Sequence, residues 1–153
     1  MNEMQKKKKG KRLIGNSMKY LFFVVLTFMM YSSCDEIDSE IPEVYVRFDL
    51  NLNSPLYNDL TFPGSSVYLS NVGFGGIIVS CLTEGEYFAY DAACTHEILP
   101  SCKVENSGLS GTCSCCGSQF QLFYSAVPVE GEAAAPLKQY NTSLSGNFLR
   151  IYN

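Results

Sequence analysis

This chain of 153 residues lacks helical periodicity and contains only one histidine. No stretch keeps an apolar period of about 3.6 residues over three turns, and no segment repeats. The single histidine, His96, lies among cysteines, so no Ser-His-Asp arrangement can be assembled around it. The scattered carboxylates of Glu84, Glu86 and Glu97 form no recognisable acid/base pair. These absences argue against a mainly helical fold and against a hydrolase.

Long apolar runs are also missing, apart from one short run near the N-terminus. Residues 20–30 (YLFFVVLTFMM) follow a basic segment that includes Lys6 to Lys9, Lys11 and Arg12. About eleven residues are too few to cross a hydrocarbon core of roughly 30 Å, but they suit a signal-peptide h-region. We therefore predict a signal peptide over residues 1–33 in preference to a transmembrane anchor.

The residues after this run resemble a lipoprotein cleavage site. The sequence M-Y-S-S-C ending at Cys34 is similar to the bacterial lipobox, although Tyr31 stands where leucine is usual. Acylation of Cys34 would anchor the protein, because each buried CH₂ contributes about 0.8 kcal/mol. The acidic residues 34–43 are similar to the export tether of Bacteroidetes surface lipoproteins. We expect a lipid-anchored protein of the cell envelope, periplasmic or surface-exposed; ordinary cleavage near Cys34 is the alternative.

Positive charge is scarce once the leader is removed. Seven of the 11 Lys and Arg residues and one of the 15 Asp and Glu residues precede Cys34, which leaves 4 basic and 14 acidic residues. A surface with this negative charge repels phosphate backbones and anionic lipid. Nucleic-acid binding is therefore excluded, and the attachment to the membrane must come from the anchor.

The part after the tether, residues 44–153, has the pattern of an all-β domain. Residues 44–50 (VYVRFDL) alternate between apolar and polar side chains. Short β-prone segments follow at 60–62, 66–69, 76–81, 87–91, 119–124 and 148–152, separated by Gly and Pro, and residues 131–136 are expected to form a loop. Several short strands with such turns favour one antiparallel sandwich or barrel.

Five of the seven cysteines fall within a short segment that also contains His96: Cys94, Cys102, Cys113, Cys115 and Cys116. Cys94, His96, Cys113 and Cys116 can be written as C-x-H-x16-C-x-x-C. Alternation along an extended segment sends both C-x-H side chains to the same side, and a C-x-x-C turn aims two sulfurs at one metal. Such a four-ligand cage suits tetrahedral Zn²⁺ or a thiolate-rich iron–sulfur cluster. Cys81 lies in an apolar run and is expected in the core.

The segments FAYDAACTHE and CSCCGSQF resemble the two ligand boxes of Rieske domains, C-x-H and C-x-C-H-G-S-x-F. Residues 129–153 resemble the closing segment of that family, so the likeness covers roughly 87–153. The resemblance implies a Rieske-like antiparallel β-sandwich or barrel with a small cysteine-rich ligand-loop subdomain. It also implies a [2Fe–2S] cluster with two cysteines on one iron and two histidines on the other.

Carried over residue by residue, the resemblance makes Cys94 and Cys113 the two thiolate ligands and His96 the first imidazole. The family has its second histidine where this chain has Cys116. A third thiolate adds negative charge, so it should lower the reduction potential of a bound cluster. The chain therefore resembles a divergent lipoprotein member of the Bacteroidetes type.

The resemblance also assigns supporting roles near the ligands. Cys115 stands where high-potential members place half of a cluster-flanking disulfide, and Cys102 is its implied partner. Gly117 and Ser118 match the Gly-Ser that follows the second ligand and donates hydrogen bonds to the cluster. Such donors raise the potential.

Three occupants of the site stay open: a [2Fe–2S] cluster, Zn²⁺, or disulfides without metal. The leader has no twin-Arg signal, and a cluster built in the cytoplasm would not survive threading through a membrane unfolded. Outside the cytoplasm, paired thiols become disulfides. We expect a metal-binding electron carrier or a structural lipoprotein rather than a catalyst, with a redox or envelope protein as its unknown partner.

Overall fold

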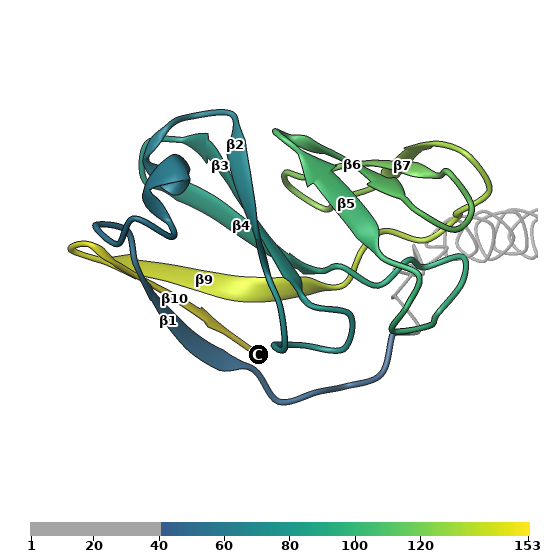
Figure 1. Cartoon of the computed structure of the whole chain (residues 1–153), viewed down its shortest axis with the longest axis horizontal. Helices are drawn as coiled ribbons and strands as arrows, with labels where there is room; N and C mark the ends of the chain where they lie inside the picture. The colour runs from purple at the N-terminus through teal and green to yellow at the C-terminus, as the bar shows by residue number, and fades with distance from the viewer. Residues whose placement is uncertain (1–40) are drawn as a thin grey trace, which may run out of the picture. The chain divides into compact units, whose positions relative to one another are not determined.

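Ten strands and one short 3₁₀ helix make up the described part of the protein, residues 41–153 of a computed structural model (Figure 1). The elements are β1 (Arg47–Asn51), η1 (Asn58–Thr61), β2 (Ser65–Leu69), β3 (Ile77–Thr83), β4 (Glu86–Asp91), β5 (Val104–Ser107), β6 (Ser110–Cys113), β7 (Gln119–Gln121), β8 (Pro128–Glu130), β9 (Gln139–Ser145) and β10 (Phe148–Tyr152). All strand pairs are antiparallel, so the all-β prediction is confirmed.

The predicted signal peptide, Cys34 and the first residues of the predicted tether lie outside the described residues. The described part of that tether packs against the domain: Ile41 is 4% exposed. The Lys138 ammonium lies 2.9 Å from the carboxylate of Glu43 and donates to the Pro42 carbonyl at 3.2 Å. No helix in the described range is long and apolar enough to cross a membrane.

The larger sheet has six strands in the order β1-β10-β9-β4-β3-β2 and brings the two ends of the domain together. β1 pairs with β10 from Arg47↔Tyr152 to Asn51↔Phe148. β10 follows β9 through a two-residue turn in which Gly146 has φ 58°, a conformation that glycine adopts without strain. Leu149 and Ile151 alternate inward along β10 and are buried.

β3 is buried on both faces, which explains why its sequence is continuously apolar. Ile77 and Val79 belong to one core cluster, inside the six-stranded sheet, whereas Ile78 belongs to the second cluster. That second cluster also contains Cys94 and Cys113, so the cysteine loops pack on the outer face of β3 and β4. Strands that are covered on both sides are expected to lose the polar alternation of half-exposed strands.

The smaller sheet, β5-β6-β7-β8, carries the second cysteine-rich turn. The sequence pattern does not predict β5, β6, β8 and β9. β5, β6 and β9 are rich in Ser, Thr, Asn and Gln and lack an apolar alternation, and β8 has only three residues. Residues 60–62, expected to be β-prone, lie in and after η1. The strand expected over 119–124 stops at Gln121, because the chain turns through Tyr124 and Ala126 at positive φ.

Candidate metal centre

Two turns carry the clustered cysteines to one place. The chain leaves β4 at Asp91 and reaches Cys94 three residues later, and Cys113 ends β6. The backbone N–H of Cys94 donates to the Cys102 carbonyl at 3.0 Å, which closes the first loop. In the second loop, the N–H of Cys113 donates to the Ser118 carbonyl at 2.8 Å. Backbone bonds therefore fix both loops independently of the sulfur atoms.

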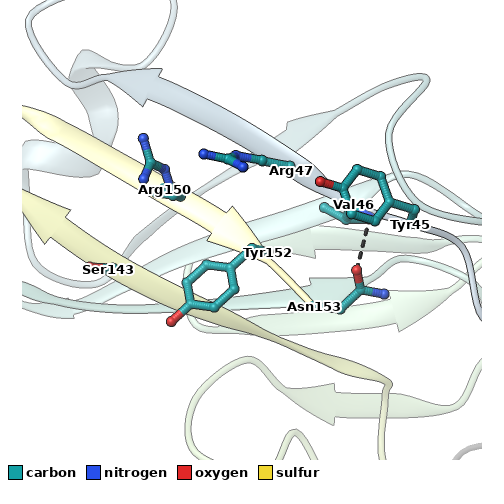
Figure 2. A pocket seen from close by; sticks show the side chains of 7 residues that line it. All are labelled: Tyr45, Val46, Arg47, Ser143, Arg150, Tyr152 and Asn153. Atoms are coloured by element: carbon teal, nitrogen blue, oxygen red, sulfur yellow. Dashed lines mark hydrogen bonds between the residues drawn. The ribbon is translucent and has the colours of Figure 1, made fainter.

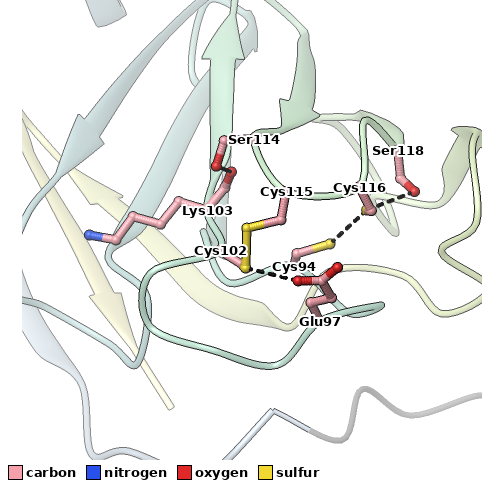
Figure 3. The surroundings of a disulfide bond; sticks show 8 residues. All are labelled: Cys94, Glu97, Cys102, Lys103, Ser114, Cys115, Cys116 and Ser118. Carbon is pink, nitrogen blue, oxygen red and sulfur yellow. Dashed lines mark hydrogen bonds between the residues drawn. A yellow bond between two sulfur atoms is a disulfide. The ribbon is translucent and has the colours of Figure 1, made fainter.

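Three thiols from these two loops converge. The sulfurs of Cys94, Cys113 and Cys116 all lie within 4.8 Å of one another. The Cys94 and Cys116 sulfurs are 3.5 Å apart, and Figure 3 shows them facing each other between the loops. Cys94 and Cys113 are buried, while Cys116 is half-buried.

The other two cysteines of the segment are joined to each other. Cys102 and Cys115 form a disulfide with an S–S distance of 2.12 Å, and this bond links the first loop to the second (Figure 3). It is the pair that the resemblance implies. A carboxylate oxygen of Glu97 lies 3.2 Å from the Cys102 sulfur. Because both sulfurs of this group are spent in the disulfide, Glu97, Cys102 and Cys115 offer no thiolate to a metal.

Ser118 connects the thiols to a strap formed by residues 131–136. Its buried hydroxyl oxygen accepts the backbone N–H groups of Glu132 and Ala133, both at 3.0 Å. A hydroxyl has two acceptor lone pairs and one proton. With both lone pairs used, the proton is left for the Cys116 sulfur, 3.2 Å from the Ser118 oxygen. Ser118 therefore has a proton that it can donate to a Cys116 thiolate.

The strap makes two further contacts with the first loop. The Thr95 hydroxyl donates to the Ala135 carbonyl at 2.7 Å. His96 Nε2 lies 3.2 Å from a carboxylate oxygen of Glu132, and the His96 side chain is 37% exposed. His96 is not a member of the three-thiol group. The structure thus brings together three of the four predicted ligands and engages the fourth with the strap.

Burial and hydrogen bonding shift the pKa values of the Cys94 and Cys116 thiols in opposite directions. Burial raises the pKa of Cys94 to about 12, despite the hydrogen bonds that its sulfur receives from the backbone N–H groups of Glu97 and His96. Burial also raises the pKa of Cys116, but the hydrogen bonds with Ser118, Cys94 and Cys113 together outweigh burial and hold that pKa below its usual value. Cys116 is therefore the thiol of this pair that loses its proton first.

Asp91 holds the base of the first loop in place. Its fully buried carboxylate accepts four hydrogen bonds, from the N–H groups of Phe74, Gly75 and Ala93 and from the hydroxyl of Tyr140, at 2.7 to 2.9 Å. The bond to Ala93 fixes the backbone immediately before Cys94. The sequence analysis did not identify Asp91, since a carboxylate at the end of a strand carries no signal of its own.

The thiols of Cys94, Cys113 and Cys116 are placed to bind a metal ion. A tetrahedral ion with metal–sulfur bonds of about 2.3 Å places its sulfurs about 3.8 Å apart, close to the 3.5 Å between Cys94 and Cys116. Three thiols and one nearby imidazole make up four soft donors, which also suit a [2Fe–2S] cluster. Sequence reasoning missed Glu132, because nothing in the sequence indicates that the strap reaches His96.

A separate hollow of 310 Å³ lies on the outer side of β1, β9 and β10 (Figure 2). It is lined by Tyr45, Val46, Arg47, Ser143, Arg150, Tyr152 and Asn153. It contains no cysteine or histidine, and Arg150 is already paired with Asp49 at 2.7 Å. The hollow therefore contributes nothing to the thiol site.

No family model matches the chain, and no curated protein matches it. Several solved structures show similarity, and three of them are described below. One is a chain of the complex of reduced oxygenase and oxidized ferredoxin in carbazole 1,9a-dioxygenase (16% identity, TM-score 0.47, 72% of this chain and 94% of that one). Another is the Sphingomonas yanoikuyae B1 ferredoxin, at 20% identity and a TM-score of 0.43, over 60% of this chain and 88% of that one.

The third is the ferredoxin of carbazole 1,9a-dioxygenase from Nocardioides aromaticivorans IC177, at 18% identity and a TM-score of 0.44, over 72% of this chain and 98% of that one. At these identities and TM-scores, no functional argument rests on the likenesses. The metal-centre hypothesis depends instead on the convergence of Cys94, Cys113 and Cys116.

Proposed function

We propose that this chain is a Rieske-like [2Fe–2S] protein of the bacterial envelope, anchored through Cys34, and that it transfers electrons. The observation that carries the proposal is the meeting of three free thiols, Cys94, Cys113 and Cys116, within 4.8 Å in loops already tied by a neighbouring disulfide. When bound, such a cluster supplies one-electron redox chemistry.

The chain's own residues would hold and shield the cluster. Cys94, Cys113 and Cys116 supply three thiolates, and His96 is the fourth donor. The strap packs on the loops through Thr95, His96 and Ser118 and limits the access of water. Electron transfer would take place at the exposed side near His96, where an envelope redox protein can approach.

A single zinc ion is the second candidate. The specific observation in its favour is the 3.5 Å between the sulfurs of Cys94 and Cys116, close to one edge of a zinc–thiolate tetrahedron, with the Cys113 sulfur within 4.8 Å of both. In that case the protein is a structural or interaction lipoprotein. Zinc and a cluster would use the same four donors, so the metal and sulfide content and the spectra must distinguish them.

The decisive experiment is to purify the whole chain anaerobically and to measure its iron, labile sulfide and zinc together with its visible and EPR spectra. Iron and sulfide in equal amounts, with a reducible visible chromophore, support the cluster. Stoichiometric zinc in a colourless protein supports the second candidate. Absence of all three from anaerobically purified and reconstituted protein contradicts both.

Cys116→Ser and His96→Ala test the ligands, and Cys81→Ser is the matched control because Cys81 is buried outside the thiol group. Both ligand variants should lose metal, while the control should keep it. Retention of wild-type metal content by Cys116→Ser would remove the third thiolate from the proposal.

The anchor needs its own test, since Cys34 lies outside the described residues. The wild-type chain should partition into the membrane fraction and require detergent for release, and Cys34→Ala should not be acylated. Mass spectrometry of the mature N-terminus measures this directly. An unmodified wild-type N-terminus would contradict lipidation without bearing on the metal centre.

A further inference from the structure

The Cys94 and Cys116 thiols are placed as a reactive pair as well as two ligands. Their sulfurs are 3.5 Å apart, and a disulfide needs about 2.05 Å, so a shift of roughly 1.5 Å closes the bond. The Cys113 sulfur lies within 4.8 Å of both.

The three thiols differ in their exposure to solvent. Cys116 is half-buried and lies next to the exposed Cys115, whereas Cys94 and Cys113 are buried. An incoming molecule therefore meets the Cys116 sulfur first. Cys94 lies behind it, in position to attack whatever Cys116 has bound.

We propose that Cys94 and Cys116 form a dithiol–disulfide couple that reduces disulfide substrates when no metal is bound. The Cys116 thiolate attacks one sulfur of the substrate, the substrate S–S bond breaks, and the first thiolate leaves and takes up a proton. Cys94 then attacks the Cys116 sulfur of the mixed disulfide and releases the second thiol. Two electrons and two protons pass from the cysteines to the substrate.

The surrounding structure favours ring closure over a persistent mixed disulfide. The Cys102–Cys115 disulfide already joins the two loops, and the N–H of Cys94 is bonded to the Cys102 carbonyl. The entropy of bringing the two loops together has therefore already been lost before the second disulfide forms. Glutathione disulfide is a suitable probe, because Cys116 is reachable from solvent.

This activity and metal binding use the same sulfurs, so they exclude each other. An oxidised Cys94–Cys116 pair has no thiolate to offer, and a bound metal blocks attack on a substrate. The inference concerns the metal-free site and holds whether that site takes iron or zinc. It thus goes beyond the proposed metal centre.

The test uses the whole chain, stripped of metal anaerobically, incubated with glutathione disulfide and analysed by peptide mass mapping. We expect the wild type to lose two thiols, to gain a Cys94–Cys116 link and to release reduced glutathione. Cys94→Ser should stop at a glutathione adduct on Cys116, because nothing resolves it. Cys116→Ser should neither oxidise nor carry an adduct at Cys94.

Cys81→Ser and Cys113→Ser are the controls, and both should still form the Cys94–Cys116 link. A Cys113–Cys116 link in the wild type would overturn the assignment of the couple. A wild type that keeps all its thiols, or that ends as a stable glutathione adduct, would overturn the activity. None of these readouts needs a metal, so a failure of metal binding in the earlier experiment is distinguishable from a failure of this couple.

Discussion

Ser118 shows how one side chain links the strap, the second loop and a thiol. Its hydroxyl accepts two backbone N–H groups from the strap, and its oxygen lies 3.2 Å from the Cys116 sulfur, within reach of a hydrogen bond to the thiolate. A hydrogen bond to sulfur stabilises the electron-rich, reduced form of a bound cluster, so it raises the potential. The same group therefore affects both the stability of the loop and the redox property.

Ser118→Ala should lower the reduction potential of a reconstituted cluster and should destabilise the protein. The N–H groups of Glu132 and Ala133 lose their acceptor, and the buried N–H of Ala133 costs about 1–3 kcal/mol when it is left unsatisfied. Spectroelectrochemistry and urea unfolding measure the two effects. Ser114→Ala is the control, because its hydroxyl bonds the Lys103 carbonyl at 3.1 Å and no sulfur. Equal potentials in the two variants would refute the hydrogen bond to Cys116.

Asp91 is the second single residue on which the site depends. In Asp91→Asn, the amide nitrogen must face a donor, since both carboxylate oxygens accept backbone N–H groups. Hydrogen bonds to charged groups contribute about 1.5–3 kcal/mol each, so we expect a loss of at least that size in unfolding free energy. Asp59→Asn, at an exposed position, should have no comparable effect. Chemical denaturation checks the difference, and near-equal stabilities would contradict the role of Asp91.

At the scale of elements, the strap and the two loops depend on one glycine at a close approach. Gly131 has φ 98°, and a Cβ there would lie 2.5 Å from the Cα and from the hydroxyl oxygen of Ser118. Real side chains do not approach backbone atoms this closely, so any other residue must push the strap away. Gly85, in the β3–β4 turn, has φ 84° and no atom within 4 Å of its Cβ position.

Gly131→Ala and Gly85→Ala therefore form a matched pair. Both should lose about 1–2 kcal/mol from the positive φ. Only Gly131→Ala should also break the Ser118 bonds to the strap and reduce metal retention. Metal content after dialysis against a chelator, together with the unfolding midpoint, separates the two effects. If both variants retain metal equally, the strap does not support the centre.

The same elements show what the sequence can and cannot predict. The β-prone segments at 76–81 and 148–152 correctly indicate β3 and β10, because both contain aliphatic residues that the core buries. β9 and the β5–β6 hairpin are held by backbone pairing and carry mostly polar residues, so they leave no apolar pattern. Residue spacing identifies the thiols, but the contact of His96 with Glu132 depends on where the strap lies in space.

For the whole molecule, the buried phenols and thiols affect stability at high pH. Burial raises the pKa values of Tyr90 and Tyr140 well above the usual tyrosine range, and for Tyr140 the carboxylate of Asp91 adds to this effect. Burial also raises the pKa values of Cys81 and Cys94. In each case the folded protein keeps a proton that the unfolded chain releases at about pH 9 to 10, so the two states differ in proton binding at alkaline pH.

The stability that these groups contribute is present in full below about pH 9. It is lost as the pH rises through the pKa values that the groups have in the folded protein. Above that pH the unfolded chain binds fewer protons than the folded one, so the free energy of unfolding falls with pH. We expect the urea midpoint of the reduced, metal-free protein to decline steadily as the pH rises above about 9.

Tyr90→Phe tests which groups cause this decline. The variant loses the hydrogen bond of 2.7 Å from the Tyr90 hydroxyl to the Tyr124 carbonyl, so it should be less stable at neutral pH. It also loses one of the protons that the fold retains, so its decline above about pH 10 should be shallower by about 1.4 kcal/mol per pH unit. Tyr45→Phe, at a side chain 78% exposed, should follow the parent curve. Parallel declines in the parent and in Tyr90→Phe would show that the Tyr90 phenol is not held protonated by the fold, and alkaline sensitivity would then have to come from Tyr140 and the buried thiols.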